Sequence, residues 1–356
     1  MIYFINHIIL LLEALVCRFG LKNNKRLFCI LSFGQLFLIL ALRGEGVGTD
    51  TAEYIRLFKN LIAGGNTYLE IGNTLLVKIC TIFSNKVQFV LMIYAFFTIL
   101  GMYMYIKEMS SDIYISIIIY ESMMYYFFSF NCMRQALAVS LIALSVVNLQ
   151  KERYWRALVF TMVATSIHAS AIIFFSIWVL AKCKIIYSKN RFLGSVVLAI
   201  AWGGLGKYVF ILIEKLIKNN RFFSRYAYYI GSSFINRGNW LHPLLFLAIL
   251  CLCCFLLYGI FEEKRNHYNI MLWSLTIGVW LYFISLEIRL VNRSTYYFTF
   301  VIISLLPNLI SQIKRKRIRY QWKASLIVFV TIYNFWMIYQ NAQGIRPYDF
   351  YWNNWL

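Results

Sequence analysis

The sequence predicts an all-α integral membrane protein that crosses the lipid bilayer many times. Of its 356 residues, 61% are hydrophobic and only 14% are charged, which is far more apolar than a soluble domain. Apolar runs of about 14–22 residues recur along the chain, and the longer ones match the ~20 residues that a helix needs to cross the hydrocarbon core. Because backbone groups in lipid must be hydrogen-bonded within the chain, we expect these runs to be helices.

The apolar runs and the basic loops between them predict about twelve spans in one polytopic domain, residues 1–356. The expected spans cover residues 2–17, 27–42, 87–106, 113–130, 132–150, 155–168, 169–182, 192–213, 241–261, 269–288, 294–313 and 322–340. The first run lacks the basic flank and the small-residue cleavage site of a signal peptide, so it counts as a span. We see no separate soluble domain and no long linker.

The distribution of lysine and arginine orients these spans. Basic residues gather in short loops, which the positive-inside rule assigns to the cytoplasm. These loops are 18–26, 151–156, 182–191, 262–268 and 314–323. Both termini and the loops 43–86 and 214–240 are then expected outside. The net charge of +21 would indicate a nucleic-acid partner in a soluble protein, but here the basic loops account for it and no nucleic acid is expected.

Two regions do not fit a simple series of spans. Residues 72–83 are apolar but short, and they contain Lys78. We therefore expect residues 54–83 to be an outer loop with a helix that lies on the outer leaflet or enters it as a re-entrant segment. The two short spans that meet at His168 predict a tight helical hairpin with this histidine near its outer tip.

A polar loop from Arg43 to Tyr54 follows the second span. Glycines at positions 44, 46 and 48 allow close backbone approach and positive φ, and Thr49 or Asp50 can cap a helix that begins near Thr51. One interpretation is a capped turn with charges at the membrane interface. The other is that Arg43 and Asp50 bind or activate a substrate.

Arg134 and Gln135 open the otherwise apolar span 132–150. A charged side chain at the bilayer centre costs about 2.5–3.5 kcal/mol, and less near the interface. The arginine therefore either reaches to the interface or faces the inside of the helix bundle. The small residues Ala136 and Ala138 favour a packed helix face, where an arginine needs an anionic partner. Arg134 and Gln135 are thus candidates for binding substrate.

His168 lies in a short hydroxyl-rich sequence, between Thr165-Ser166-Ile167 and Ala169-Ser170. Imidazole titrates near neutral pH and suits general acid–base catalysis. A lone histidine is also a common structural residue, so both interpretations stay open at this point.

Two more basic clusters are expected at the outer face. Arg289 and Arg293 are four residues apart, so they share one face if the helix is continuous; pairing with Glu287 is the alternative, purely interfacial interpretation. Arg221 and Arg225 stand among phenylalanine and tyrosine residues of a long outer loop. Guanidinium and aromatic groups together suit an anion attached to a sugar or a lipid.

Metal and nucleotide motifs are missing from the sequence. Three of the eight cysteines, at positions 251, 253 and 254, share one apolar run, which indicates packing, and no set of cysteine and histidine residues has the spacing of a zinc site. P-loop, nucleophile-elbow, DxD and HExxH motifs do not occur. We therefore expect no metal and no cofactor, and the sequence disfavours a nucleotide-dependent cytoplasmic enzyme.

A series of short motifs in a fixed order gives the chain a family resemblance. The motifs are Arg43 with Val47-Gly48-Thr49-Asp50-Thr51, Tyr54 and Phe58; Glu70-Ile71-Gly72; Met133-Arg134-Gln135-Ala136-Leu137-Ala138; Ile167-His168-Ala169-Ser170-Ala171; and Asn292-Arg293-Ser294-Thr295-Tyr296-Tyr297-Phe298, leading to Leu306-Pro307. In this order the chain resembles, over nearly its whole length, the EpsG family of bacterial exopolysaccharide polymerases, which are related in function to the Wzy polymerases of O-antigen and capsule. The departures are Met133, where an aromatic residue is common, and Ala169 after the histidine.

The resemblance implies a fold similar to the GT-C-type glycosyltransferases that use lipid phosphosugars. It implies an enzyme that joins undecaprenyl-diphosphate-linked oligosaccharide repeat units at the outer face of the bacterial plasma membrane, with energy from the phosphosugar bond. The catalytic candidates are His168 and Asp50. The candidates for binding diphosphate or sugar are Arg43, Tyr54, Arg134, Gln135, Arg221, Arg225, Arg289 and Arg293.

The same resemblance suggests the remaining partners. The lipid-linked oligosaccharide and membrane lipid are expected ligands, and a chain-length regulator and a flippase are candidate protein partners. Loop 214–240 and the aromatic tail Tyr348-Asp349-Phe350-Tyr351-Trp352 are expected to supply a groove for the oligosaccharide.

Two other functions compete with the polymerase. A flippase of lipid-linked oligosaccharide would show repeated halves with broken helices, and we find no convincing internal repeat. A membrane O-acetyltransferase would need an acyl-donor site that opens to the cytoplasm, and His168 is its only plausible catalytic histidine.

Overall fold

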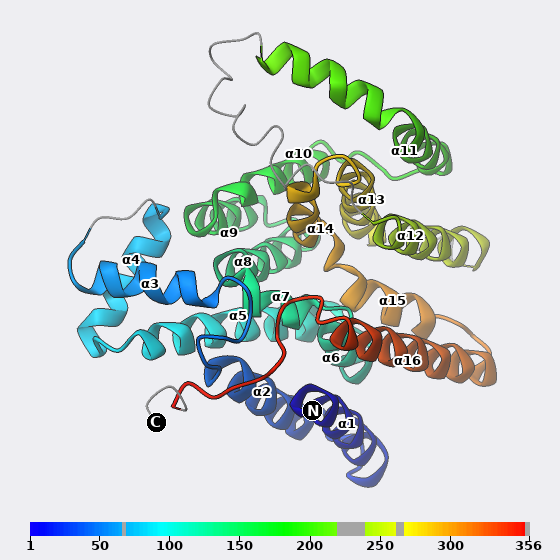
Figure 1. Cartoon of the computed structure of the whole chain (residues 1–356). Helices are drawn as coiled ribbons and strands as arrows, with labels where there is room; N and C mark the ends of the chain where they lie inside the picture. Colours follow the sequence, from blue (N-terminus) through cyan, green and yellow to red (C-terminus); the bar gives the residue numbers. More distant parts are fainter. Residues whose placement is uncertain (66–68, 219–238, 261–266, 353–356) are drawn as a thin grey trace. The chain divides into compact units, whose positions relative to one another are not determined.

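A computed structural model of the chain describes residues 1–65, 69–218, 239–260 and 267–352 (Figure 1). This part of the chain is helical, and the all-α prediction is confirmed for it. Its one extended pairing is an isolated antiparallel bridge between Arg43 and Phe350. The bridge joins the loop after the second helix to the C-terminal tail.

The chain forms two compact units. Unit 1 comprises Met1–Trp178 and Leu306–Leu356, and unit 2 comprises Val179–Leu305. The chain passes from unit 1 to unit 2 within helix α10, Phe175–Lys182, and returns within α15, Ile302–Ser311. A single polytopic domain stays a prediction.

Unit 1 holds most of the helices. They are α1 (Ile2–Leu15), the π-helix η1 (Val16–Gly20), α2 (Lys25–Ala41), α3 (Thr51–Ile62), α4 (Ile71–Phe83), α5 (Val87–Met109), α6 (Ile113–Ser122), α7 (Tyr125–Asn131), α8 (Met133–Gln150), α9 (Tyr154–Ile167), the 3₁₀ helix η2 (Ala169–Phe174) and α16 (Lys316–Tyr339). Helix α8 is central and packs against both α5 and α9. At Gly101 of α5, an added Cβ would lie 2.9 Å from the side chain of Ser140 of α8, so a glycine is needed for this close helix contact.

Unit 2 contains α11 (Lys189–Lys218), α12 (Leu241–Ile260), α13 (Asn269–Ile284), the 3₁₀ helix η6 (Arg289–Thr295) and α14 (Tyr296–Thr299). The hydroxyl of Ser274 on α13 donates a hydrogen bond of 2.8 Å to the carbonyl of Phe298 on α14. A Cβ on Gly278 would lie 2.5 Å from the Thr299 side chain. The two helices are therefore held close together.

Five described helices are long and apolar enough to cross a membrane. They are Ile2–Gly20, Val87–Met109, Met133–Gln150, Lys189–Val209 and Lys316–Tyr339. Two bent pairs, Ile113–Ser122 with Tyr125–Asn131 (41°) and Arg289–Thr299 with Ile302–Ser311 (45°), raise the number to seven if each pair is one span. This supports a multi-pass membrane protein, whereas the expected number of about twelve stays a prediction. In the first pair, the bend comes at Met124, whose φ of 66° lies in the left-handed region.

The predicted outer loop has a clearer secondary structure than the sequence suggested. It contains two helices, α3 and α4, and Gly64 with a φ of 83° follows the end of α3. The short apolar helix near 72–83 and the helix start at Thr51 are confirmed. The first predicted segment does end at His168, because α9 ends at Ile167 and η2 begins at Ala169. The tight hairpin with this histidine at its outer tip stays a prediction.

In unit 1, the carboxylate of Asp112 forms ion pairs with two cationic side chains. Its carboxylate is 2.8 Å from an Nη atom of Arg18 and 2.7 Å from Nζ of Lys323, and the Asp112 side chain is only 3% exposed. Burial alone would raise the pKa of Asp112, but hydrogen bonds from the arginine and the lysine outweigh it and hold the pKa below its ordinary value. All three residues belong to segments that the sequence assigns to the cytoplasmic side.

Candidate functional site

An ion pair between Arg134 and Glu70 is the centre of the candidate site. Arg134 stands in the first turn of α8, and Glu70 immediately precedes α4. Nη1 of the arginine is 2.5 Å from a carboxylate oxygen of Glu70, and the two side chains are 16% and 25% exposed. The buried Nε–H of Arg134 has no hydrogen-bond partner among the described residues. One hydrogen-bond donor of the guanidinium is therefore unsatisfied within the described residues, and this donor is buried.

Aromatic rings enclose one side of this pair. The Arg134 guanidinium lies 5.5 Å from the centre of the Tyr54 ring, within cation–π range, and it is also a hydrogen-bond partner of the Tyr54 hydroxyl. Tyr54 and Phe58 stack along α3, and Phe58 stacks on Tyr94 of α5 at 5.5 Å. Burial raises the pKa of Tyr54 to about 12, despite the lowering effect of Arg134, so its hydroxyl stays protonated at neutral pH.

The start of α4 connects Arg134 to the turn that carries His168. One oxygen of Glu70 accepts a hydrogen bond of 3.2 Å from the backbone N–H of Ala169. The Asn73 amide donates to the other oxygen at 3.0 Å and to the carbonyl of Ile167. The carboxylate of Glu70 is therefore shared between the arginine and the histidine turn.

A glycine explains why α4 comes so close to this turn. A Cβ at Gly72 would lie 2.5 Å from the hydroxyl of Ser166 and 2.6 Å from its carbonyl oxygen, distances that a side chain could not occupy. The motif Glu70-Ile71-Gly72 thus combines an anion for Arg134 with the close backbone contact that places it.

His168 is half-buried at the end of α9. Its Nδ1 is 2.8 Å from the hydroxyl of Ser170. If Nδ1 carries the hydrogen and donates it to this hydroxyl, Nε2 is the basic nitrogen; in the opposite tautomer Nε2 carries the proton. The serine can therefore determine which nitrogen of the ring accepts a proton.

Asp50 lies in a separate polar cluster on the neighbouring loop. It occupies the N-cap position of α3 but makes no capping hydrogen bond through its side chain, so the predicted cap by Thr49 or Asp50 is wrong. The Thr49 hydroxyl donates to the Asp50 carboxylate at 2.9 Å, and its backbone N–H donates to Asn131 at 2.5 Å. The polar groups of this loop form hydrogen bonds with α7 instead. Gly48 has a φ of 90°, and a Cβ there would lie 2.5 Å from the carbonyl oxygen of Phe130.

Arg43 is enclosed by protein, and the structure does not bring it together with Arg134. The Arg43 residue is 1% exposed, and its Nη1 donates a hydrogen bond of 2.5 Å to the carbonyl of Leu40. Its guanidinium lies 5.5 Å from the ring of Phe130. Burial lowers the pKa of Arg43 to about 10. A role for Arg43 in binding substrate stays a prediction, as does one for Gln135, which is 3% exposed on α8.

The other predicted arginines belong to unit 2 or lie outside the described residues. Arg289 and Arg293 are exposed on η6 of unit 2, whereas Arg134 and His168 belong to unit 1. The expectation that these two arginines share a face does not hold, because η6 is a 3₁₀ helix, in which residues four apart point about 120° from each other. Arg221 and Arg225 lie outside the described residues.

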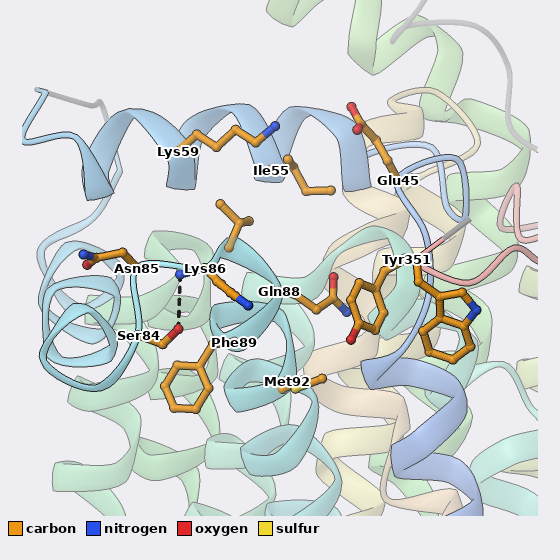
Figure 2. Close-up of a pocket in the computed structure, with 12 residues that line it drawn as sticks. Glu45, Ile55, Lys59, Ser84, Asn85, Lys86, Gln88, Phe89, Met92 and Tyr351 are labelled. Carbon is orange, nitrogen blue, oxygen red and sulfur yellow. Dashed lines mark hydrogen bonds between the residues drawn. The ribbon is translucent and has the colours of Figure 1, made fainter. Parts of the chain in front are cut away.

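A pocket of about 860 Å³ adjoins this region of unit 1. Figure 2 shows Glu45, Ile55 and Lys59 on the α3 side of the pocket, with Ser84, Asn85 and Phe89 opposite them and Tyr351 at one end. Lys86, Gln88 and Trp352 also line it. The aromatic tail thus contributes to a pocket, as the sequence suggested, but its partners there are α3 and the start of α5. The predicted contribution from loop 214–240 lies mostly outside the described residues.

Three residues of the site were missing from the predicted set. Glu70 stands within one of the family motifs, and this was the signal that could have identified it. Asn73 and Tyr94 are joined by a hydrogen bond of 2.6 Å from the tyrosine hydroxyl to the amide oxygen. In the sequence, the only signal for these two residues is that each places a polar group within an apolar helix.

A comparison with protein families identifies the chain. The family model for the EpsG family matches residues 26–350. The chain belongs to the EpsG family. Membership implies a membrane protein with a polysaccharide polymerase-type role. No curated protein and no solved structure matches the chain. The described residues of this EpsG-family protein contain no group of three or more His, Cys, Asp or Glu side chains that could hold a metal ion.

Proposed function

We propose that this EpsG-family protein is a glycosyltransferase that joins undecaprenyl-diphosphate-linked repeat units at the outer face of the bacterial plasma membrane. The observation that carries the proposal is Arg134, a partly buried guanidinium with an unsatisfied N–H. An arginine that shares the Glu70 carboxylate with the turn after His168 is the kind of arrangement that transfer from a diphosphate leaving group needs. Family membership supports the same reaction class.

In the proposed reaction, a hydroxyl oxygen of one repeat unit attacks the anomeric carbon of the sugar at the reducing end of the growing glycan. A new glycosidic C–O bond forms, and the C–O bond to the diphosphate breaks. Undecaprenyl diphosphate leaves with the bonding electron pair. Arg134 stabilises the charge that grows on the leaving oxygens, because its planar fork can bind phosphate through two N–H groups. A role for Arg293 in binding the diphosphate stays a prediction from the sequence.

His168 is the proposed base for the acceptor hydroxyl. Its Nε2 takes the proton if Nδ1–H donates to Ser170, which lies at the required distance of 2.8 Å. Asp50 is the alternative base. A carboxylate is a weaker base than imidazole at neutral pH, and for this reason we favour His168.

The decisive experiment is deletion of the gene, followed by analysis of the glycans that remain attached to lipid. We expect long polymer to disappear and single lipid-linked repeat units to accumulate, and complementation by the wild-type gene to reverse both changes. Absence of lipid-linked units outside the membrane in the deletion strain would point to a flippase instead. Loss of an acetyl substituent with normal chain length would indicate an acetyltransferase.

The proposed sidedness is tested separately. Single cysteines introduced at positions 50 and 348 in a cysteine-free background should react with an impermeant maleimide in intact cells, and a cysteine at position 316 should not. Reaction at position 316 from outside would contradict the orientation and with it the outer active site.

A further inference from the structure

We propose that the 860 Å³ pocket between α3, the start of α5 and the C-terminal tail binds an acidic, carboxylate-bearing segment of the oligosaccharide. This inference rests on the proposed function and specifies its substrate. The pocket would bind sugars of the glycan, whereas Arg134 would bind the diphosphate.

The first argument is charge. Lys59 and Lys86 line the pocket, and within the described part of the chain neither lysine has an ion-pair partner. The single carboxylate in the lining belongs to Glu45, which lies near the α3 end of the pocket (Figure 2). The lining therefore carries an excess of one positive charge, and unpaired ammonium groups bind carboxylates through charge-assisted hydrogen bonds.

The second argument is the combination of aromatic and amide groups. Trp352 is 44% exposed. It stacks on Phe350 with ring centres 4.4 Å apart and contacts the Tyr351 ring at 5.1 Å in a T-shaped arrangement, so part of the indole surface is available to a ligand. The Gln88 side chain donates a hydrogen bond of 2.5 Å to the carbonyl of Ala41, which fixes its position and leaves its oxygen as an acceptor. A ligand with both apolar ring faces and hydroxyl groups fits such a lining.

The third argument is position along α3. Tyr54 and Phe58 project from the face of α3 that meets Arg134 and α5, whereas Ile55 and Lys59 line the pocket. Successive helix positions differ by about 100° around the axis. The pocket and Arg134 are thus on adjacent sides of one helix, whose diameter with side chains is about 10–12 Å. A glycan whose diphosphate lies at Arg134 can place its next sugars in the pocket.

Binding by the full-length protein in detergent tests the inference directly. The probes are oligosaccharides cut from the host's own polymer, used either with intact carboxylates or after chemical reduction of the carboxylates to alcohols, and the readout is titration calorimetry. We expect the reduced probe to bind at least about tenfold more weakly, because each charge-assisted hydrogen bond is lost. Equal binding of the two probes, or a host polymer without carboxylates, would overturn the inference.

Variants with opposite charge effects sharpen the test. Lys59→Gln and Lys86→Gln should each weaken binding of the acidic probe by about tenfold, whereas Glu45→Gln should tighten it. Lys78→Gln is the matched control, since Lys78 is an exposed lysine of α4 outside the pocket. An equal loss in Lys78→Gln, or no loss in Lys59→Gln and Lys86→Gln, would contradict the site.

A lipid headgroup is the competing ligand. Vesicles of phosphatidylglycerol would then protect the pocket and displace the acidic probe, and this result would assign the lysines to membrane anchoring. The two proposals fail differently. Wild-type protein that elongates lipid-linked units but shows no carboxylate preference refutes only the pocket. Wild-type protein that prefers the acidic probe but never joins units refutes only the polymerase.

Discussion

Two carboxylates of unit 1, Asp112 and Glu70, differ in how completely they and their cationic partners are satisfied. Asp112 binds both Arg18 and Lys323 and is 3% exposed. Glu70 is 25% exposed and serves one arginine, one amide and one backbone N–H, while the Nε–H of Arg134 stays unsatisfied. The first cluster is complete, whereas the second keeps one unsatisfied donor.

We therefore expect the Asp112 cluster to contribute mainly to stability and the Glu70–Arg134 pair mainly to function. A buried carboxylate with two fixed cations contributes to folding, and removal of the carboxylate leaves those cations uncompensated. A partly exposed arginine with an unused donor contributes less to folding but is prepared for a ligand. The sequence assigns the Asp112 cluster to the cytoplasm and the Glu70–Arg134 pair to the outside. Variants of the two clusters should therefore differ in whether they change the amount of folded protein or the turnover of each molecule.

The largest effect is expected from Arg134→Lys. Lysine keeps the charge but loses the fork that binds phosphate through two N–H groups, so turnover should fall at least about a hundredfold. Synthesis of long polymer from purified lipid-linked units by reconstituted protein measures it, at equal amounts of folded protein. Near-normal turnover in Arg134→Lys would show that the reaction does not need the guanidinium. The two clusters would then not differ in function.

Asp112→Asn should lower the stability of the folded protein and leave its turnover unchanged. The variant leaves Arg18 and Lys323 without a buried anion, which we expect to cost about 2 kcal/mol after allowance for the partial exposure of the cations. The thermal unfolding midpoint in detergent should decrease, whereas turnover per folded molecule should not change. A strong loss of turnover at full stability would show that this cluster is not merely structural.

The same residue gives a pH dependence with a defined sign. Because its cationic partners hold the folded pKa of Asp112 below its ordinary value, the ion pair stabilises the folded state above the unfolded pKa. This contribution is lost as the pH falls through the folded pKa. The difference in midpoint between wild type and Asp112→Asn should therefore decrease on acidification, and a constant difference would argue against the ionised pair.

Glu70→Gln should have an intermediate effect on activity. Glu70 is a positioning residue, since it touches Arg134 and the turn after His168. The amide keeps an acceptor for the turn but lowers the charge that orients the arginine, and we expect kcat to fall about tenfold with little increase in KM. Glu70→Asp retains the charge but not the reach, so it should not restore activity. An unchanged kcat with a raised KM would indicate that Glu70 contacts substrate directly.

The sequence predicted the local features around the Glu70–Arg134 pair well. Helix α3 begins at Thr51, α9 stops before His168, and Arg134 stands in the first turn of α8. Glycines, polar residues and short apolar runs mark these positions in the neighbouring sequence. The pairing of Glu70 with Arg134 joins positions 64 residues apart, and no local pattern reports such a contact.

Tertiary structure also overrides the local pattern at several breaks. The sequence predicts a continuous span over 113–130, yet Met124 adopts a left-handed conformation and separates α6 from α7. Methionine has no preference for this conformation. The 3₁₀ geometry around Arg289 and Arg293 likewise has no signal in the hydrophobic periodicity. The break between α3 and α4 did have a signal in the sequence, because Gly64 and Gly65 follow the end of α3.

The smallest effect is expected from Tyr54→Phe. The ring that lies 5.5 Å from Arg134 is retained, and only the hydroxyl hydrogen bond is lost, so turnover should fall about threefold. Burial raises the pKa of Tyr54 to about 12, and the hydroxyl is therefore neutral in wild-type protein throughout the range below about pH 10. The pH profile of turnover in this range should have the same shape in wild type and variant. Tyr54→Leu, which also removes the ring, should lose clearly more activity. A changed profile in Tyr54→Phe would show that this hydroxyl, and not the His168 imidazole, exchanges a proton with the acceptor.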